Sequence, residues 1–72
     1  MKINGITVHK SITVARVCAA VERYNQSLDN PGFCLACGEE AMGVEGDAEH
    51  YECESCGETA VFGASNLLIY MA

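Results

Sequence analysis

The chain has 72 residues, half of them hydrophobic, and a formal net charge of −6 at pH 7. This length limits it to one domain, and the hydrophobic fraction excludes a disordered chain. The longest apolar run is far too short to span a membrane. A domain of this size buries little core and normally needs a further stabilising element such as a metal ion.

The N-terminal part predicts one strand followed by one helix. Residues 3–9 alternate weakly between apolar and polar types and predict a short strand, with Asn4-Gly5 as a turn signal. The helix is expected to begin at Ser11, whose hydroxyl can cap the first turn, and to end at about Leu28.

One face of this predicted helix is apolar. Its residues recur every three or four positions, with Cys18 alongside them: Val14, Val17, Val21, Tyr24 and Leu28. The spacing predicts a face that packs on the rest of the chain, and a dimer or partner surface is the alternative. Cys18 is the odd cysteine, and on this face it is interpreted as a small buried hydrophobe rather than a nucleophile.

Two Cys-x-x-Cys-Gly motifs, or knuckles, follow a turn at 30–32. The first knuckle is Cys34-Leu35-Ala36-Cys37-Gly38 and the second is Cys53-Glu54-Ser55-Cys56-Gly57. Fifteen residues separate them, a spacing typical of four-cysteine zinc sites. Two intervening residues let both sulfurs of a motif face one ion, and the glycine permits positive φ. The predicted metal ligands are Cys34, Cys37, Cys53 and Cys56, whose thiolates suit a tetrahedral Zn²⁺ site.

Disulfides, a redox pair and iron are the alternatives to zinc. The first ten residues show no secretory signal, so we expect a cytoplasmic chain that keeps its thiols reduced. A redox Cys-x-x-Cys normally lies in a βαβ unit, which this pattern does not predict. Rubredoxins also bind iron with two such knuckles, but these knuckles lack the usual proline and lie closer together, so zinc is preferred.

Neither histidine is predicted to be a ligand. His9 is interpreted as a surface residue, since four cysteines already complete a zinc shell. His50 stands three residues before Cys53, outside the Cys-x-x-Cys spacing, and is interpreted as a solvated strand residue.

The sequence around the knuckles predicts a small sheet. Residues 41–44 and 50–52 are expected to form strands joined by a polar turn at 45–48, and residues 59–62 a third strand. Ser65 can cap a last helix over residues 67–70, and a fourth strand there is the alternative.

Three segments together resemble small zinc-ribbon proteins of phages and prophages: Gly32-Phe33-Cys34-Leu35-Ala36-Cys37-Gly38, Tyr51-Glu52-Cys53-Glu54-Ser55-Cys56-Gly57 and Val61-Phe62-Gly63-Ala64. The resemblance implies an α+β fold, with an N-terminal helix packed on a small antiparallel zinc-ribbon sheet. We therefore expect one domain over residues 1–72, with the strand and helix in 1–30 and the ribbon with its apolar C-terminal segment in 31–72. The resemblance implies no particular activity, because this fold hosts many functions.

Charge is divided unevenly along the chain. Residues 1–30 hold all four basic residues and two acidic ones, whereas residues 31–72 hold eight acidic residues and no basic one. A strongly acidic ribbon favours a partner with a basic surface and disfavours phosphate backbones.

The predicted function is that of a non-enzymatic zinc protein whose acidic surface binds a basic protein partner. Catalysis is not expected, because four cysteines leave no open position on the ion for water. The resemblance implies a phage-encoded protein directed at a host protein. Nucleic-acid binding through Lys10, Arg16 and Arg23 is the alternative, and a homodimer through the helix face or residues 67–71 is also expected.

Overall fold

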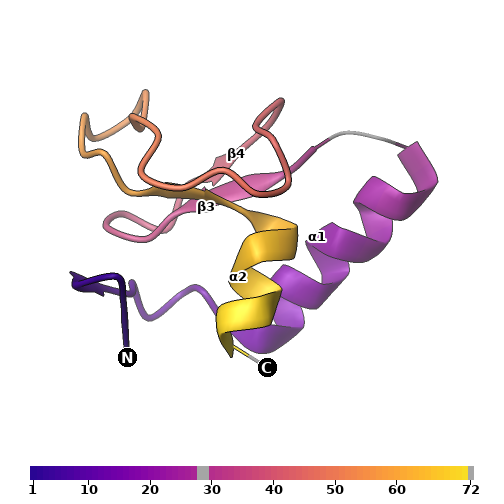
Figure 1. Cartoon of the computed structure of the whole chain (residues 1–72), viewed down its shortest axis with the longest axis horizontal. Helices are drawn as coiled ribbons and strands as arrows, with labels where there is room; N and C mark the ends of the chain where they lie inside the picture. Colours follow the sequence, from indigo (N-terminus) through magenta and orange to yellow (C-terminus); the bar gives the residue numbers. More distant parts are fainter. Residues whose placement is uncertain (28–29, 72) are drawn as a thin grey trace.

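The computed structural model describes residues 1–27 and 30–71, with only the backbone described for residues 24–27. A hairpin of β1 (Lys2–Ile3) and β2 (Ile6–Thr7) precedes the helix α1 (Val14–Ser27). The ribbon then contributes β3 (Gly32–Cys34), β4 (Glu40–Ala41) and β5 (Val61–Gly63), and the helix α2 (Ala64–Met71) follows. Both sheets are antiparallel, with strand orders β1-β2 and β4-β3-β5, which confirms the predicted α+β class (Figure 1).

The N-terminal segment forms a hairpin, so the prediction of one continuous strand was wrong. Asn4 and Gly5 both have positive φ, 51° and 81°, as a two-residue type I′ turn requires. Ile3 pairs with Ile6 across this turn, and Ile3 is buried in the core. The turn signal was therefore strong enough to divide the segment into two short strands.

Helix α1 is capped by Thr13, not by Ser11 as predicted. The Thr13 hydroxyl oxygen accepts a hydrogen bond of 3.1 Å from the Arg16 amide, the usual contact of an N-cap residue. The Ser11 hydroxyl instead lies 2.9 Å from His9 Nδ1 and accepts a hydrogen bond from Arg16 Nη1. The predicted helix end at Leu28 lies outside the described residues.

Thr13→Ala is expected to destabilise the fold by about 1 kcal/mol, because one amide of the first helical turn loses its acceptor. Ser11→Ala is the matched comparison, since it removes a hydroxyl that does not cap the helix. Chemical denaturation of both variants measures the difference. A larger loss for Ser11→Ala than for Thr13→Ala would contradict this capping arrangement.

The buried face of α1 is shorter than predicted. Val17 and Ala20 are fully buried, and Cys18 and Val21 are partly buried. Val14, however, is 47% exposed, whereas Ile12, just before the helix begins, is buried in the core. The side chains of Tyr24 and Leu28, also predicted on this face, lie outside those described.

The ribbon sheet places two phenylalanines toward the helices. Phe33 of β3 pairs directly with Phe62 of β5, and both are fully buried. The Arg16 guanidinium of α1 lies 4.7 Å from the centre of the Phe33 ring, and the Tyr70 ring of α2 meets Phe62 edge to face. Alternation along the strands therefore puts the small residues of β3, β4 and β5 on the opposite face.

The predicted strand at 50–52 reduces to a single bridge between Tyr51 and Val61. His50, just before it, has a φ of 58°, which lies in the left-handed region and ends the extended path. Its Nδ1 lies 3.3 Å from the Thr59 carbonyl oxygen, and its ring packs against Phe62. His50 is thus a turn residue rather than a strand residue.

The C-terminal segment forms a helix, which decides between the two predicted alternatives. Figure 1 shows α2 beneath the ribbon sheet and beside α1, and Leu67 is fully buried there. The Tyr70 hydroxyl donates a hydrogen bond of 2.8 Å to Glu49 Oε2 and accepts one of 3.1 Å from Asn4 Nδ2. Neither described helix is long and apolar enough to cross a bilayer.

Glu49 connects α2 to the ribbon and gives the fold an acid-sensitive contact. Asn66 Nδ2 and the Tyr70 hydroxyl each donate a hydrogen bond of 2.8 Å to Glu49 Oε2, and they hold the pKa of the Glu49 carboxyl below its ordinary value of 4.5. A depressed pKa in the folded state means that the contact contributes stability above pH 4.5 and loses it as the pH falls through the folded-state pKa.

Glu49→Gln is therefore expected to unfold more easily than the wild type at pH 7, with a difference that shrinks as the pH falls below 4.5. Urea unfolding at several pH values measures this, with the metal content of both proteins recorded at each pH. Glu45→Gln, at a carboxylate for which no such hydrogen bond is found among the described residues, is the control. An equal deficit at every pH would refute the assignment.

Candidate metal centre

The two knuckles share one backbone conformation. In the first, the Cys34 amide donates to the Glu39 carbonyl oxygen at 2.9 Å, and the Gly38 amide donates to the Cys34 carbonyl oxygen at 2.8 Å. The equivalent residues nineteen positions later repeat both hydrogen bonds, at 2.8 and 2.9 Å. Gly38 and Gly57 have nearly equal φ values of 82° and 79°, as the motif predicted.

The first knuckle also anchors the N-terminal segment. The His9 amide donates a 2.7 Å hydrogen bond to the Leu35 carbonyl oxygen. A Cβ at position 38 would overlap the Ser11 hydroxyl and crowd the His9 ring, so only glycine permits this close approach. This contact was not predicted from the sequence. Gly38 was already explained by the positive φ of the turn, so it gave no further indication that another segment lies against it.

The four knuckle cysteines converge on one point. All four Sγ atoms lie within 4.8 Å of one another, and the Cys34–Cys56 and Cys37–Cys53 pairs are each 3.7 Å apart. A tetrahedral ion with metal–sulfur bonds of about 2.3 Å requires sulfurs about 3.8 Å apart. A disulfide would need about 2.05 Å, and all five cysteines are free. The geometry fits one tetrahedral metal ion.

The thiols at this centre differ in their surroundings. Burial raises the pKa of the Cys34 thiol to about 12, whereas a hydrogen bond from the Cys56 amide lowers the pKa of Cys53 to about 7. Cys56 itself is exposed. A metal ion must therefore displace the Cys34 proton when it binds, and metal affinity should fall in acid.

The other candidate ligands lie elsewhere in the fold. Within residues 1–27 and 30–71, only the four knuckle cysteines bring together the ligand atoms of three or more histidine, cysteine, aspartate or glutamate side chains. His9 is paired with Ser11, and His50 is in contact with Thr59 and Phe62. Cys18 lies on α1 outside the four-cysteine cluster, and it is only partly buried rather than buried as predicted.

No protein-family model, curated protein or solved structure matches this chain. The sulfur geometry is therefore the observation on which the site rests. It shows a four-cysteine cluster that can hold a metal ion, in an arrangement consistent with a zinc-ribbon-like motif.

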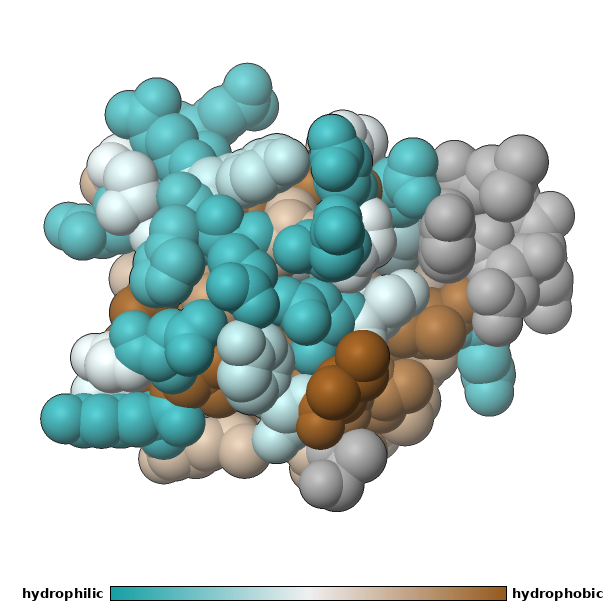
Figure 2. Space-filling view, in the orientation of Figure 1, coloured by the Kyte–Doolittle hydropathy of each residue, from teal (hydrophilic) through white to brown (hydrophobic). Residues whose placement is uncertain are grey.

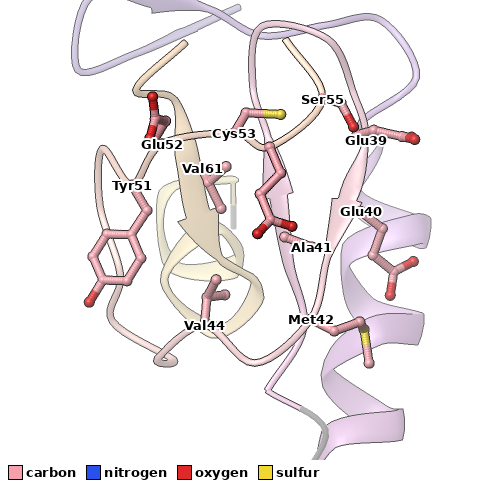
Figure 3. Close-up of a pocket in the computed structure, with 11 residues that line it drawn as sticks. Glu39, Glu40, Ala41, Met42, Val44, Tyr51, Glu52, Cys53, Ser55 and Val61 are labelled. Atoms are coloured by element: carbon pink, nitrogen blue, oxygen red, sulfur yellow. The ribbon is translucent and has the colours of Figure 1, made fainter. Parts of the chain in front are cut away.

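A hollow of about 420 Å³ lies beside the metal centre and includes Cys53 in its lining (Figure 3). It is formed where residues 39–44 and 51–55 meet across Val61. Sequence reasoning missed it, because the two segments become neighbours only when Tyr51 bridges to β5.

Proposed function

We propose that this protein is a non-enzymatic zinc protein, in which the ion holds the ribbon rigid and an acidic surface binds a protein partner. The observation that carries the proposal is the pair of 3.7 Å sulfur separations between the two knuckles. Tetrahedral four-sulfur sites favour zinc or iron–sulfur centres, and the knuckles lack the proline of rubredoxin-like iron sites. Four protein ligands leave no open coordination position for a reacting water.

The acidic residues of the ribbon lie largely at the surface. Seven of the eight are exposed, and the eighth, Glu40, forms an ion pair with Arg23. Figure 2 shows hydrophilic residues gathered over the upper part of one face, where Figure 1 places the second knuckle. A bound Zn²⁺ with four thiolates adds further negative charge beside them. Such a surface steers a basic partner toward the ribbon.

The structure lends little support to the nucleic-acid alternative. It depends on Lys10, Arg16 and Arg23, and both arginines are engaged within the fold. Arg16 covers the Phe33 ring and donates to Ser11, and Arg23 is paired with Glu40. Phosphate binding would have to compete with these contacts, close to an acidic ribbon.

Elemental analysis and an association assay test the proposal. Purified protein should contain close to one zinc per chain and little iron. A basic partner captured from a host lysate should associate with a rate that falls as salt rises, and duplex DNA should not bind. Glu45→Lys with Asp47→Lys should slow this association, and Glu49 is left intact because it holds α2. Tight, salt-sensitive DNA binding, or an unchanged rate after charge reversal, would reject the proposed surface.

The resemblance to phage zinc-ribbon proteins supports a finer proposal, that this is a cytoplasmic phage-encoded protein that acts on a host protein.

We also propose a homodimer. Its contact would use Ile69, which is 77% exposed on α2, since Leu67 is already buried within the chain. Figure 2 shows hydrophobic residues in the lower part of the face, where α2 lies. Light scattering at high concentration should give twice the monomer mass, and Ile69→Lys should give the monomer. A monomeric wild type would refute the dimer.

A further inference from the structure

The two faces of the ribbon sheet are covered differently. One face carries Phe33 and Phe62 and is closed by the two helices. The other carries small residues: Gly32 and Ala41 are paired, and Gly32 is also paired with Gly63. The 44–46 loop covers part of this second face, and the rest is open as the hollow in Figure 3.

The floor and sides of this hollow are apolar. Val61 and Ala41 form the sheet surface, and Val44 lies at one end. Met42 and Tyr51 stand on opposite sides of it in Figure 3, and they are 55% and 41% exposed. The volume of about 420 Å³ lies within the range of about 300–1,000 Å³ that is usual for ligand sites. It is large enough to accept an inserted side chain from another molecule.

The rim of the hollow is acidic. Glu39, Glu52 and Glu54 line it and are exposed, and no partner for their carboxylates is found within the described part of the chain. Glu40 also lines the rim but is paired with Arg23. Among the residues that the structure describes, no lysine or arginine lines the hollow. Within the described part of the chain, these carboxylates do not converge on one point as the four sulfurs do, so they form no cation site of their own.

We propose that the hollow binds a basic segment of a partner protein, in which one apolar side chain is flanked by lysine or arginine. The apolar side chain lies on the floor between Met42 and Tyr51, and the flanking cations reach the free carboxylates of the rim. Burial of the apolar side chain supplies affinity, while the rim sets the sign of the partner's charge and speeds its approach. Phosphate groups and acidic segments are repelled by the same rim. The inference rests on the proposed acidic interaction surface and gives it a location and a partner class.

Short peptides test the proposal on the metal-loaded full chain. Each carries one leucine, isoleucine, phenylalanine or methionine between pairs of lysines, and matched peptides replace the lysines by glutamate or the apolar residue by serine. At low salt we expect the lysine peptides to shift the amide NMR signals of residues 39–44 and 51–55. The two kinds of matched peptide should bind at least several-fold more weakly.

Variants locate the contact. Met42→Ser removes apolar surface at a side chain that is already largely exposed, and is expected to weaken binding about tenfold. Glu52→Gln with Glu54→Gln should weaken it roughly threefold to tenfold and flatten its salt dependence. Glu45→Gln with Asp47→Asn also removes two negative charges from the acidic surface, but outside the hollow, so it should weaken binding much less than the change at Glu52 and Glu54.

The outcomes separate this inference from the proposed function. Equal losses from the two pairs of acidic residues, or no loss from Met42→Ser, would overturn the hollow as the site while leaving a diffuse acidic surface intact. Binding that is insensitive to salt and to both charge pairs would instead overturn the acidic surface. Absence of binding by every lysine peptide at low salt would overturn the proposed partner class.

Discussion

Cys34→Ser is expected to abolish metal binding and, with it, cooperative unfolding. The Cys34 side chain is fully buried, and its sulfur lies 3.7 Å from that of Cys56. A buried serine hydroxyl does not replace a thiolate ligand, and three cysteines alone leave the site incomplete. Structural zinc contributes on the order of 10 kcal/mol to the folding of small domains, so the variant should lose most of its stability. Elemental analysis and thermal unfolding followed by circular dichroism measure the two effects.

Cys18→Ala is the matched control, because it removes a thiol that lies on α1 and outside the sulfur cluster. It should keep the metal and lose roughly 1 kcal/mol of stability through poorer packing. Full metal content together with a cooperative transition in Cys34→Ser would show that the four sulfurs are not the ligands.

Gly63→Ala is expected to destabilise the ribbon by about 3 kcal/mol. A Cβ at position 63 would overlap the backbone carbonyl oxygens of Glu45 and Gly46, so the crossing loop would have to move. Two hydrogen bonds hold that loop in place. The Gly63 amide donates to the Ala48 carbonyl oxygen, and the Asn66 amide donates to the Gly46 carbonyl oxygen. Chemical denaturation of the metal-loaded variant gives the loss of unfolding free energy.

Gly46→Ala provides the comparison for this prediction. Position 46 is in the same contact, but a Cβ there would meet only Ser65 at 3.8 Å, an ordinary van der Waals distance. Its φ lies outside the positive range, so alanine introduces no backbone strain. Gly46→Ala should therefore be tolerated. Equal stability of the two alanine variants would contradict the close packing of this loop against β5.

The candidate metal site was readable from the sequence because its information is local. Each knuckle is specified by two cysteines and the glycine that follows, and its hydrogen bonds stay within six residues, as from Cys34 to Glu39. The convergence of the two knuckles followed from the fifteen-residue spacing. The identity of the four clustered residues therefore needed no knowledge of the rest of the fold.

The helix start and the returning strand could not be predicted, because they depend on side-chain contacts and on a backbone conformation that the pattern of residue types does not specify. Ser11 and Thr13 are both good capping residues, and the selection of Thr13 depends on His9 and Arg16 engaging Ser11. The residues around Tyr51 looked extended in sequence, but the left-handed conformation of His50 limits them to one bridge.

The C-terminal segment shows the same limit. A short apolar run fits a helix or a strand equally well by periodicity alone. The structure decides through Leu67, which is buried beside α1, and through Tyr70, whose hydroxyl reaches Glu49. Neither contact can be predicted from the residues next to Leu67 and Tyr70 in the sequence.

The matching knuckle conformations have a consequence for the order of folding events. Because each knuckle closes its own hydrogen bonds within a few residues, both can form before any contact between distant elements. A metal ion bound by the four sulfurs would then join two formed knuckles that lie nineteen residues apart, and the entropy cost of closing such a loop rises only slowly with its length. We therefore expect metal capture to come early and the helices to dock afterwards, onto a ribbon that has already closed.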